Sequence, residues 1–124
     1  MDRNVVTIVT ANIAGAARME QAHPNKFELL AQAINRYKPD LIGLQEVIQV
    51  PEAVRDDMKA LQDKLRRMDR STWTSFFFPH LDSHLQSHPK KWESDAFARY
   101  LGQRVFQGTG LLLRSETCEM LGLW

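Results

Sequence analysis

The chain has 124 residues, which is enough for one small domain and too few for two. Its contents of 44% hydrophobic and 25% charged residues are those of a soluble globular protein and exclude wholesale disorder. A net charge of +1 excludes a global field that would steer the chain onto nucleic acid or a membrane, and a single cysteine excludes an intrachain disulfide. No signal peptide or transmembrane segment is visible, so we expect a cytoplasmic protein.

Two apolar runs in the first half of the chain predict strands. Residues 5–11 are dominated by β-branched side chains without glycine or proline, which predicts a buried strand. Residues 12–17 contain Gly15 and small side chains, as is typical of a loop. Residues 41–45 form a second apolar run, which is too short for a helix and favours another buried strand.

Two stretches predict helices because their apolar side chains recur at helical spacing. The first starts near Pro24 and stops at Pro39, which disfavours helical geometry in the residue before it. The second starts near Pro51. The apolar stripes are Phe27, Leu30, Ala31, Ile34 and Tyr37 in the first helix, and Val54, Met58, Leu61, Leu65 and Met68 in the second. The charged residues of the second stretch are expected on a solvated face: Arg55, Asp56, Asp57, Lys59, Asp63, Lys64 and Arg66.

The second half of the chain is less regular. Residues 73–78 predict an aromatic strand, residues 80–107 a polar irregular segment, residues 109–113 a further strand, and residues 117–124 a last one. Strands that alternate with helices are typical of an α/β fold. The last strand ends in apolar residues without a polar tail, so we expect the chain to be a truncated domain.

Two polar side chains stand where predicted strands run into loops. Asn12 follows the first strand, and Glu46 follows the second. In open α/β sheets, ligands bind outside the carboxyl ends of the strands, and amide and carboxylate oxygens suit Mg²⁺ or Mn²⁺. Such a cation neutralises charge in phosphoryl transfer. The alternative interpretation is structural: asparagine is common in turns, and a glutamate at a strand end is commonly solvated.

The sequence around these residues resembles the endonuclease/exonuclease/phosphatase superfamily of DNase I-like proteins. The resemblance rests on Thr-Ala-Asn-Ile at 10–13, and more specifically on Lys-Pro-Asp-Leu-Ile-Gly-Leu-Gln-Glu-Val at 38–47. In that superfamily the Asn and Glu of these motifs help to hold a catalytic divalent metal, which implies Asn12 and Glu46 as ligands of Mg²⁺ or Mn²⁺. The resemblance further implies that Gln45 supports these ligands or is structural, and that Asp40 shapes the turn into the strand.

A looser match covers the strand Gln-Gly-Thr-Gly-Leu-Leu-Leu-Arg-Ser at 107–115, where the Arg-Ser order is reversed. Arg114 therefore has two interpretations, a group near a phosphate or, as we prefer, an ordinary charged residue at a strand end. The superfamily's later motifs, Gly-Asp-x-Asn and Ser-Asp-His, supply the general base and further metal contacts. This sequence contains neither a Gly-Asp nor an Asp-His pair, so the catalytic residues remain unknown.

The resemblance implies that residues 1–124 are the N-terminal half of a four-layer α/β sandwich, with a mixed sheet flanked by helices and the C-terminal catalytic half missing. The implied activity of the parent domain is metal-dependent hydrolysis of a phosphodiester or phosphomonoester, in nucleic acid, phospholipid or nucleotide. The alternative is an inactive fragment or a non-enzymatic binding module. A half-sandwich leaves one sheet face without its partner, so we expect the chain to aggregate or to be partly molten.

Other residues offer weaker alternatives. His80, His84 and His88 are four residues apart and on a helix would share one face suited to zinc, but an exposed polar loop is the preferred interpretation. Cys118 is expected to be a small buried hydrophobe. Base-stacking platforms are the alternative for the aromatic residues, for which we favour a core role: Trp73, Trp92, Trp124 and residues 76–78.

Overall fold

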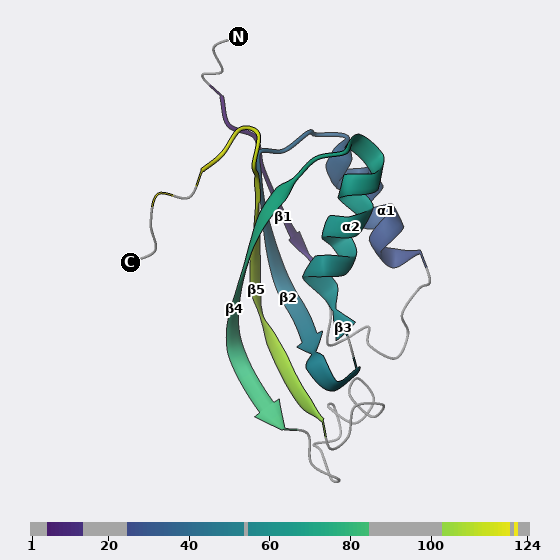
Figure 1. Ribbon diagram of the computed structural model, residues 1–124, viewed down its shortest axis with the longest axis vertical. Helices are drawn as coiled ribbons and strands as arrows, with labels where there is room; N and C mark the ends of the chain where they lie inside the picture. Colours follow the sequence, from purple (N-terminus) through teal and green to yellow (C-terminus); the bar gives the residue numbers. More distant parts are fainter. Residues whose placement is uncertain (1–4, 14–24, 54, 85–102, 120, 122–124) are drawn as a thin grey trace.

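A computed structural model describes residues 5–13, 25–53, 55–84, 103–119 and 121 (Figure 1). The elements are β1 (Ile8–Asn12), α1 (Lys26–Asn35), β2 (Leu41–Val50), the 3₁₀ helix η1 (Pro51–Ala53), β3 (Arg55–Asp56), α2 (Asp57–Asp69), β4 (Trp73–His84) and β5 (Arg104–Arg114). The strands form one sheet in the order β1-β2-β5-β4, and β3 pairs with β2. β1 and β2 are parallel and the other pairs antiparallel, so the expected mixed sheet of an α/β fold is confirmed.

The two described helices lie side by side on one face of the sheet (Figure 1). The face that they cover holds the main apolar core: Ile13, Ala31, Ile34, Ile42, Leu44, Val47, Met58, Leu61, Leu65, Trp73 and Leu112. No described helix lies on the opposite face. None of the described helices is long and apolar enough to cross a membrane.

The first strand is less buried than the sequence predicts. β1 is an edge strand that starts only at Ile8, and Val5 and Val6 before it are exposed. Val9 and Ala11 pack against the core, whereas Ile8 is 59% exposed on the other face. The prediction of a buried strand over residues 5–11 is therefore wrong in its burial, because an edge strand facing one layer of helices buries only alternate side chains.

Asp40 anchors the turn between α1 and β2, in keeping with the role expected of it. Its buried carboxylate accepts hydrogen bonds from the Thr7 backbone nitrogen at 2.9 Å and from the Thr117 hydroxyl at 2.7 Å. Its own backbone nitrogen donates to the Thr7 oxygen at 2.8 Å. One carboxylate therefore joins the chain before β1, the start of β2 and the segment after β5, and these bonds offset the cost of burying it.

The second helix begins later than predicted. It starts at Asp57, after a 3₁₀ turn and the two-residue β3, and Asp56 caps it by accepting the Lys59 backbone nitrogen at 3.1 Å. Met58, Leu61 and Leu65 are buried as predicted. The prediction of a wholly solvated charged face is wrong at Asp57, which is 1% exposed. Asp57 precedes Leu61 by four residues and so lies on the buried side of the helix.

The last two strands are longer than the sequence predicts. β4 continues through Pro79 to His84, and β5 already starts at Arg104, so both ends of the expected irregular segment belong to the sheet. The sheet tolerates Pro79 because β4 is an edge strand and the register shifts beside it. The expected strand over 117–124 is wrong at Thr117, Cys118 and Glu119, which lie in a turn and in irregular chain, and Cys118 is half-buried.

Candidate metal site

The carboxyl end of β1 lies against the middle of β2. In the parallel register Asn12 stands beside Gln45, and the Ile13 backbone nitrogen donates to the Gln45 oxygen at 3.1 Å. Ile13 is buried in the core, whereas Asn12 is exposed on the face away from the helices. The end of β1 is thus held by one buried side chain and one backbone bond, which leaves the Asn12 side chain beside Gln45 and Glu46.

Glu46 occupies a bulge in β2. Leu44 pairs with Gly110 of β5, and Val47 pairs with Gly108, so three steps along β2 match two along β5. Both Leu44 and Val47 face the core. Strict alternation would have turned Glu46 to the core as well, and the extra residue of the bulge avoids burying its carboxylate there.

The backbone of Glu46 adopts a conformation that glycine accepts more easily. Its φ is 56°, in the left-handed region, and only Lys38 and Arg70 among the described non-glycine residues share a positive φ. Such a residue costs on the order of 1 to 3 kcal/mol and persists only where the surrounding structure fixes it. Residues of this kind concentrate at ligand-binding sites, so the bulge singles out Glu46.

The side chains of Asn12 and Glu46 meet across 34 positions of sequence. Asn12 Nδ2 donates a hydrogen bond to Glu46 Oε1 at 3.1 Å. The sequence therefore found two residues that the fold brings into contact at an accessible edge of the sheet. A divalent cation between them would be met by the Glu46 carboxylate and by the Asn12 amide oxygen, which requires rotation of that amide. Two protein oxygens would leave most of the coordination shell to water.

No group of three or more His, Cys, Asp or Glu side chains with the geometry of a metal site occurs among the described residues. The pair of Asn12 and Glu46 contains one such side chain and one amide, so it lies outside that definition. Its fit to a hard cation rests on its two oxygen-bearing groups and on their contact.

Arg114 lies at the other end of the sheet. It follows Leu113, which pairs with the first residue of β2, whereas Glu46 lies beyond the middle of that strand. Its Nε donates to the Pro39 oxygen at 2.9 Å, its Nη1 lies 3.3 Å from Asp69 Oδ2, and its guanidinium stacks over Trp73 at 4.6 Å. Of its two interpretations, the structure supports a charged residue at a strand end.

His80 and His84 do not share a helix face. His80 and His84 both lie on β4, where a rise of about 3.3 Å per residue sets residues four apart at roughly 13 Å, too far for one zinc ion. His88 lies outside the described residues. The helical zinc site is therefore wrong for the first two histidines, and the exposed loop is corrected to a strand over residues 80–84.

The described aromatic residues of β4 divide between the two sides of the sheet. Trp73 is buried and Phe77 packs against the core, as predicted. Phe76 and Phe78 stack on each other at 6.4 Å on the other face, where Phe78 is 43% exposed. Trp92 and Trp124 lie outside the described residues.

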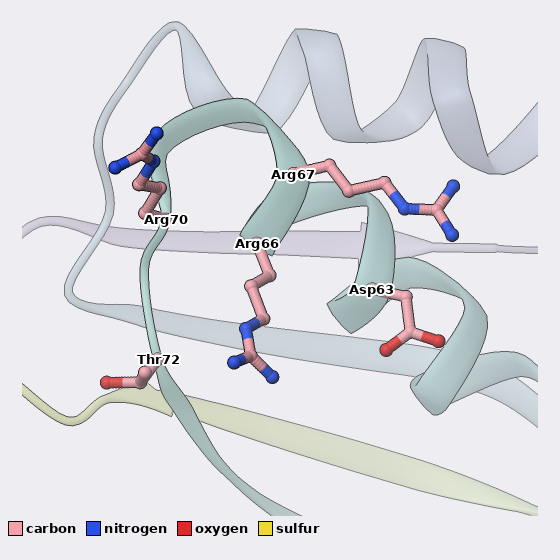
Figure 2. A pocket seen from close by; sticks show the side chains of 5 residues that line it. All are labelled: Asp63, Arg66, Arg67, Arg70 and Thr72. Atoms are coloured by element: carbon pink, nitrogen blue, oxygen red, sulfur yellow. The ribbon is translucent and has the colours of Figure 1, made fainter.

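A wide pocket of about 580 Å³ lies at the carboxyl end of α2, lined by Asp63, Arg66, Arg67, Arg70 and Thr72. Figure 2 shows that the three guanidinium groups point in different directions rather than toward one another. An anion site needs donors that converge on one point. Cationic side chains in the last turn of a helix also stabilise its dipole, which accounts for Arg66 and Arg67 without a ligand.

Comparison with known proteins identifies a fold and no more. No protein-family model matches the chain, and no curated protein matches it. A solved structure, an endonuclease/exonuclease/phosphatase family protein from Leptotrichia buccalis C-1013-b, is similar with a TM-score of 0.57 and 19% sequence identity. The match covers 89% of this chain and 38% of that one, so the chain spans well under half of its neighbour. The mixed sheet and its helices are consistent with a partial DNase I-like domain.

Proposed function

We propose that this chain carries part of the active site of a metal-dependent phosphoesterase domain of the endonuclease/exonuclease/phosphatase kind. The observation that carries the proposal is the contact of 3.1 Å between Asn12 and Glu46, at the end of a parallel strand and in a bulge. The fold of the structural neighbour and the motif at residues 38–47 support the same function. The reaction is hydrolysis of a phosphodiester or phosphomonoester.

In this proposal Asn12 and Glu46 hold Mg²⁺ or Mn²⁺ on the face of the sheet away from the helices. The bound cation supplies positive charge that stabilises the phosphate oxygens as charge develops on them. Glu46 contributes the negative charge that attracts the cation, and Asn12 fixes its place beside the sheet edge. Gln45 pairs with Asn12 in the register and precedes Glu46 in the chain, so in this proposal it helps to orient them.

The first test is calorimetric titration of the 124-residue chain with Mg²⁺ and Mn²⁺. We expect saturable binding that weakens at least tenfold in Glu46→Gln, which removes the charge and keeps the size of the side chain. Glu28→Gln is the matched control, because Glu28 is a similarly accessible carboxylate on α1 paired with Lys64. Equal affinities in Glu46→Gln and the wild type would contradict the proposal.

Hydrolysis separates an enzyme from a binding module. Turnover of bis(p-nitrophenyl) phosphate or p-nitrophenyl phosphate that needs Mg²⁺ and stops with a chelator supports the phosphoesterase. Metal binding without turnover of either ester in this chain assigns it the metal site alone. The two esters distinguish the diester from the monoester reaction.

A further inference from the structure

A buried acidic residue stands behind the proposed metal site. Asp57 Oδ2 accepts a hydrogen bond from the Ile48 backbone nitrogen at 3.1 Å. The Arg55 guanidinium binds the same carboxylate through Nε at 3.0 Å and Nη2 at 3.3 Å. A buried charge needs such partners. One of these three bonds links Asp57, at the start of α2, to the backbone of β2.

The Ile48 bond fills a gap along one side of β2. On that side β1 ends opposite Gln45, and β3 begins its pairing opposite Gln49. Between these two points no strand of the described residues accompanies β2, and Glu46 lies there. The Asp57 carboxylate therefore takes the place of a strand partner just where β2 carries its bulge.

The strained backbone of Glu46 needs both of its flanks fixed. On the near side, β1 binds Gln45 through the bond from Ile13. On the far side, Asp57 holds the Ile48 backbone nitrogen through its carboxylate. We infer that Asp57 is a positioning residue, which acts through the Ile48 backbone to keep the Glu46 carboxylate beside Asn12.

The effect of Asp57 on metal affinity rests on the proposed function, but its effect on Glu46 does not. Groups that orient metal ligands typically change metal affinity 10- to 100-fold when they are removed. A residue that merely starts the helix would change stability alone. Asp56 provides the matched control, since it caps the same helix through Lys59 and does not bind Ile48.

Two readouts on the 124-residue chain test the inference. The first is the Mn²⁺ affinity, which reports on the site. The second needs no metal: it is the strong intraresidue nuclear Overhauser cross-peak between the amide proton and Hα of Glu46, which reports the positive φ of this residue. Asp57→Ala is expected to weaken Mn²⁺ binding about tenfold or more and to lose that cross-peak. Asp57→Asn, whose amide oxygen can still accept the Ile48 bond, is expected to retain both, and so is Asp56→Ala.

If Asp57→Ala does not fold, a second variant still tests the inference. Arg55→Met combined with Asp57→Leu replaces the ion pair by apolar side chains of similar volume, an exchange that proteins commonly tolerate. It still removes the acceptor of Ile48, so the Glu46 cross-peak is expected to disappear. An unchanged cross-peak in this folded double variant would overturn the inference. A wild type that keeps the cross-peak and does not bind Mn²⁺ would overturn the proposed function alone.

Discussion

Glu46 combines a carboxylate with a backbone conformation that suits glycine. The bulge turns the side chain away from the core and toward Asn12, at an expense in backbone energy of roughly 1 kcal/mol or more. A position chosen only for stability would carry glycine, which adopts a positive φ without steric cost. The presence of glutamate there is therefore better explained by what its carboxylate binds.

We predict that Glu46→Gly stabilises the fold and removes metal binding. Relief of the positive φ is expected to raise the free energy of unfolding by about 1 kcal/mol, measured by urea denaturation, while Mg²⁺ binding is lost. Arg70→Gly is the control, because Arg70 has a φ of 58° at the end of α2 and no contact with the site. It should be stabilised similarly and bind metal as the wild type does. Destabilisation by Glu46→Gly would contradict this account.

The sequence located Asn12 and Glu46 but not the means by which the fold joins them. Each residue follows an apolar run, from which the sequence predicted that both stand at strand ends on one sheet edge. That holds for Asn12 at the end of β1, but it is wrong for Glu46, because β2 continues through it to Val50. The bulge could not be predicted from the sequence, because residues 44–47 contain neither glycine nor proline. Asp57 was assigned to the solvated face because its neighbours are charged, although its spacing of four from Leu61 places it on the buried side of the helix.

At the scale of elements, Asp69 joins α2 to β5. Its carboxylate lies 3.3 Å from the Arg114 guanidinium and 3.8 Å from Lys38 Nζ, and it accepts the Ser71 backbone nitrogen at 2.9 Å. Burial raises the pKa of Asp69, but the Ser71 hydrogen bonds and the Arg114 charge together outweigh it and hold the pKa below 3.8. The end of the second helix is thus fastened to the last strand by a charged group.

This junction predicts a dependence of stability on acid. A carboxyl group whose pKa is lowered by folding contributes its full stability above the unfolded pKa near 3.8, and loses it as the pH falls through the lower folded value. Asp69→Asn should therefore be less stable than the wild type by about 1 kcal/mol at pH 6, with the difference shrinking below pH 4. Urea denaturation across this pH range measures it. Asp63→Asn, on the exposed side of α2, should show a smaller difference, and equal differences would contradict the assignment.

The helices were more predictable than the strands because a helix carries its pattern within one segment. Met58, Leu61 and Leu65 recur at helical spacing and are buried as expected. The end of β4 after Pro79 and the start of β5 form strands because they pair with each other, as His84 does with Arg104. Partners far apart in sequence determine such a strand, and its polar composition reflects its place at the edge.

At the scale of the whole molecule, the two faces of the sheet differ. Helices cover one face, whereas the other carries apolar side chains in rows across the strands, of which Ile8 and Phe78 are exposed and Leu113 is buried. One row contains Ile8, Leu41 and Leu113, and the next contains Leu111 and Phe76. Asn12 lies on this second face, so the proposed site and the apolar rows share one surface. A face of this kind is typical of a sheet that packs on a further layer.

We predict that the chain self-associates through this second face. Ile8 and Phe78 are 59% and 43% exposed there, and burying such side chains is favourable by about 25 cal/mol for each Å² removed from water. The double variant Ile8→Thr with Phe78→Thr keeps strand propensity and should shift the sedimentation profile toward monomer. Leu29→Thr is the control, because Leu29 is 54% exposed on α1, away from the sheet. A wild type that is monodisperse and monomeric, with a sharp reversible thermal transition, would contradict the prediction. It would mean that the rows of the second face are too interrupted by threonine and glycine to drive association.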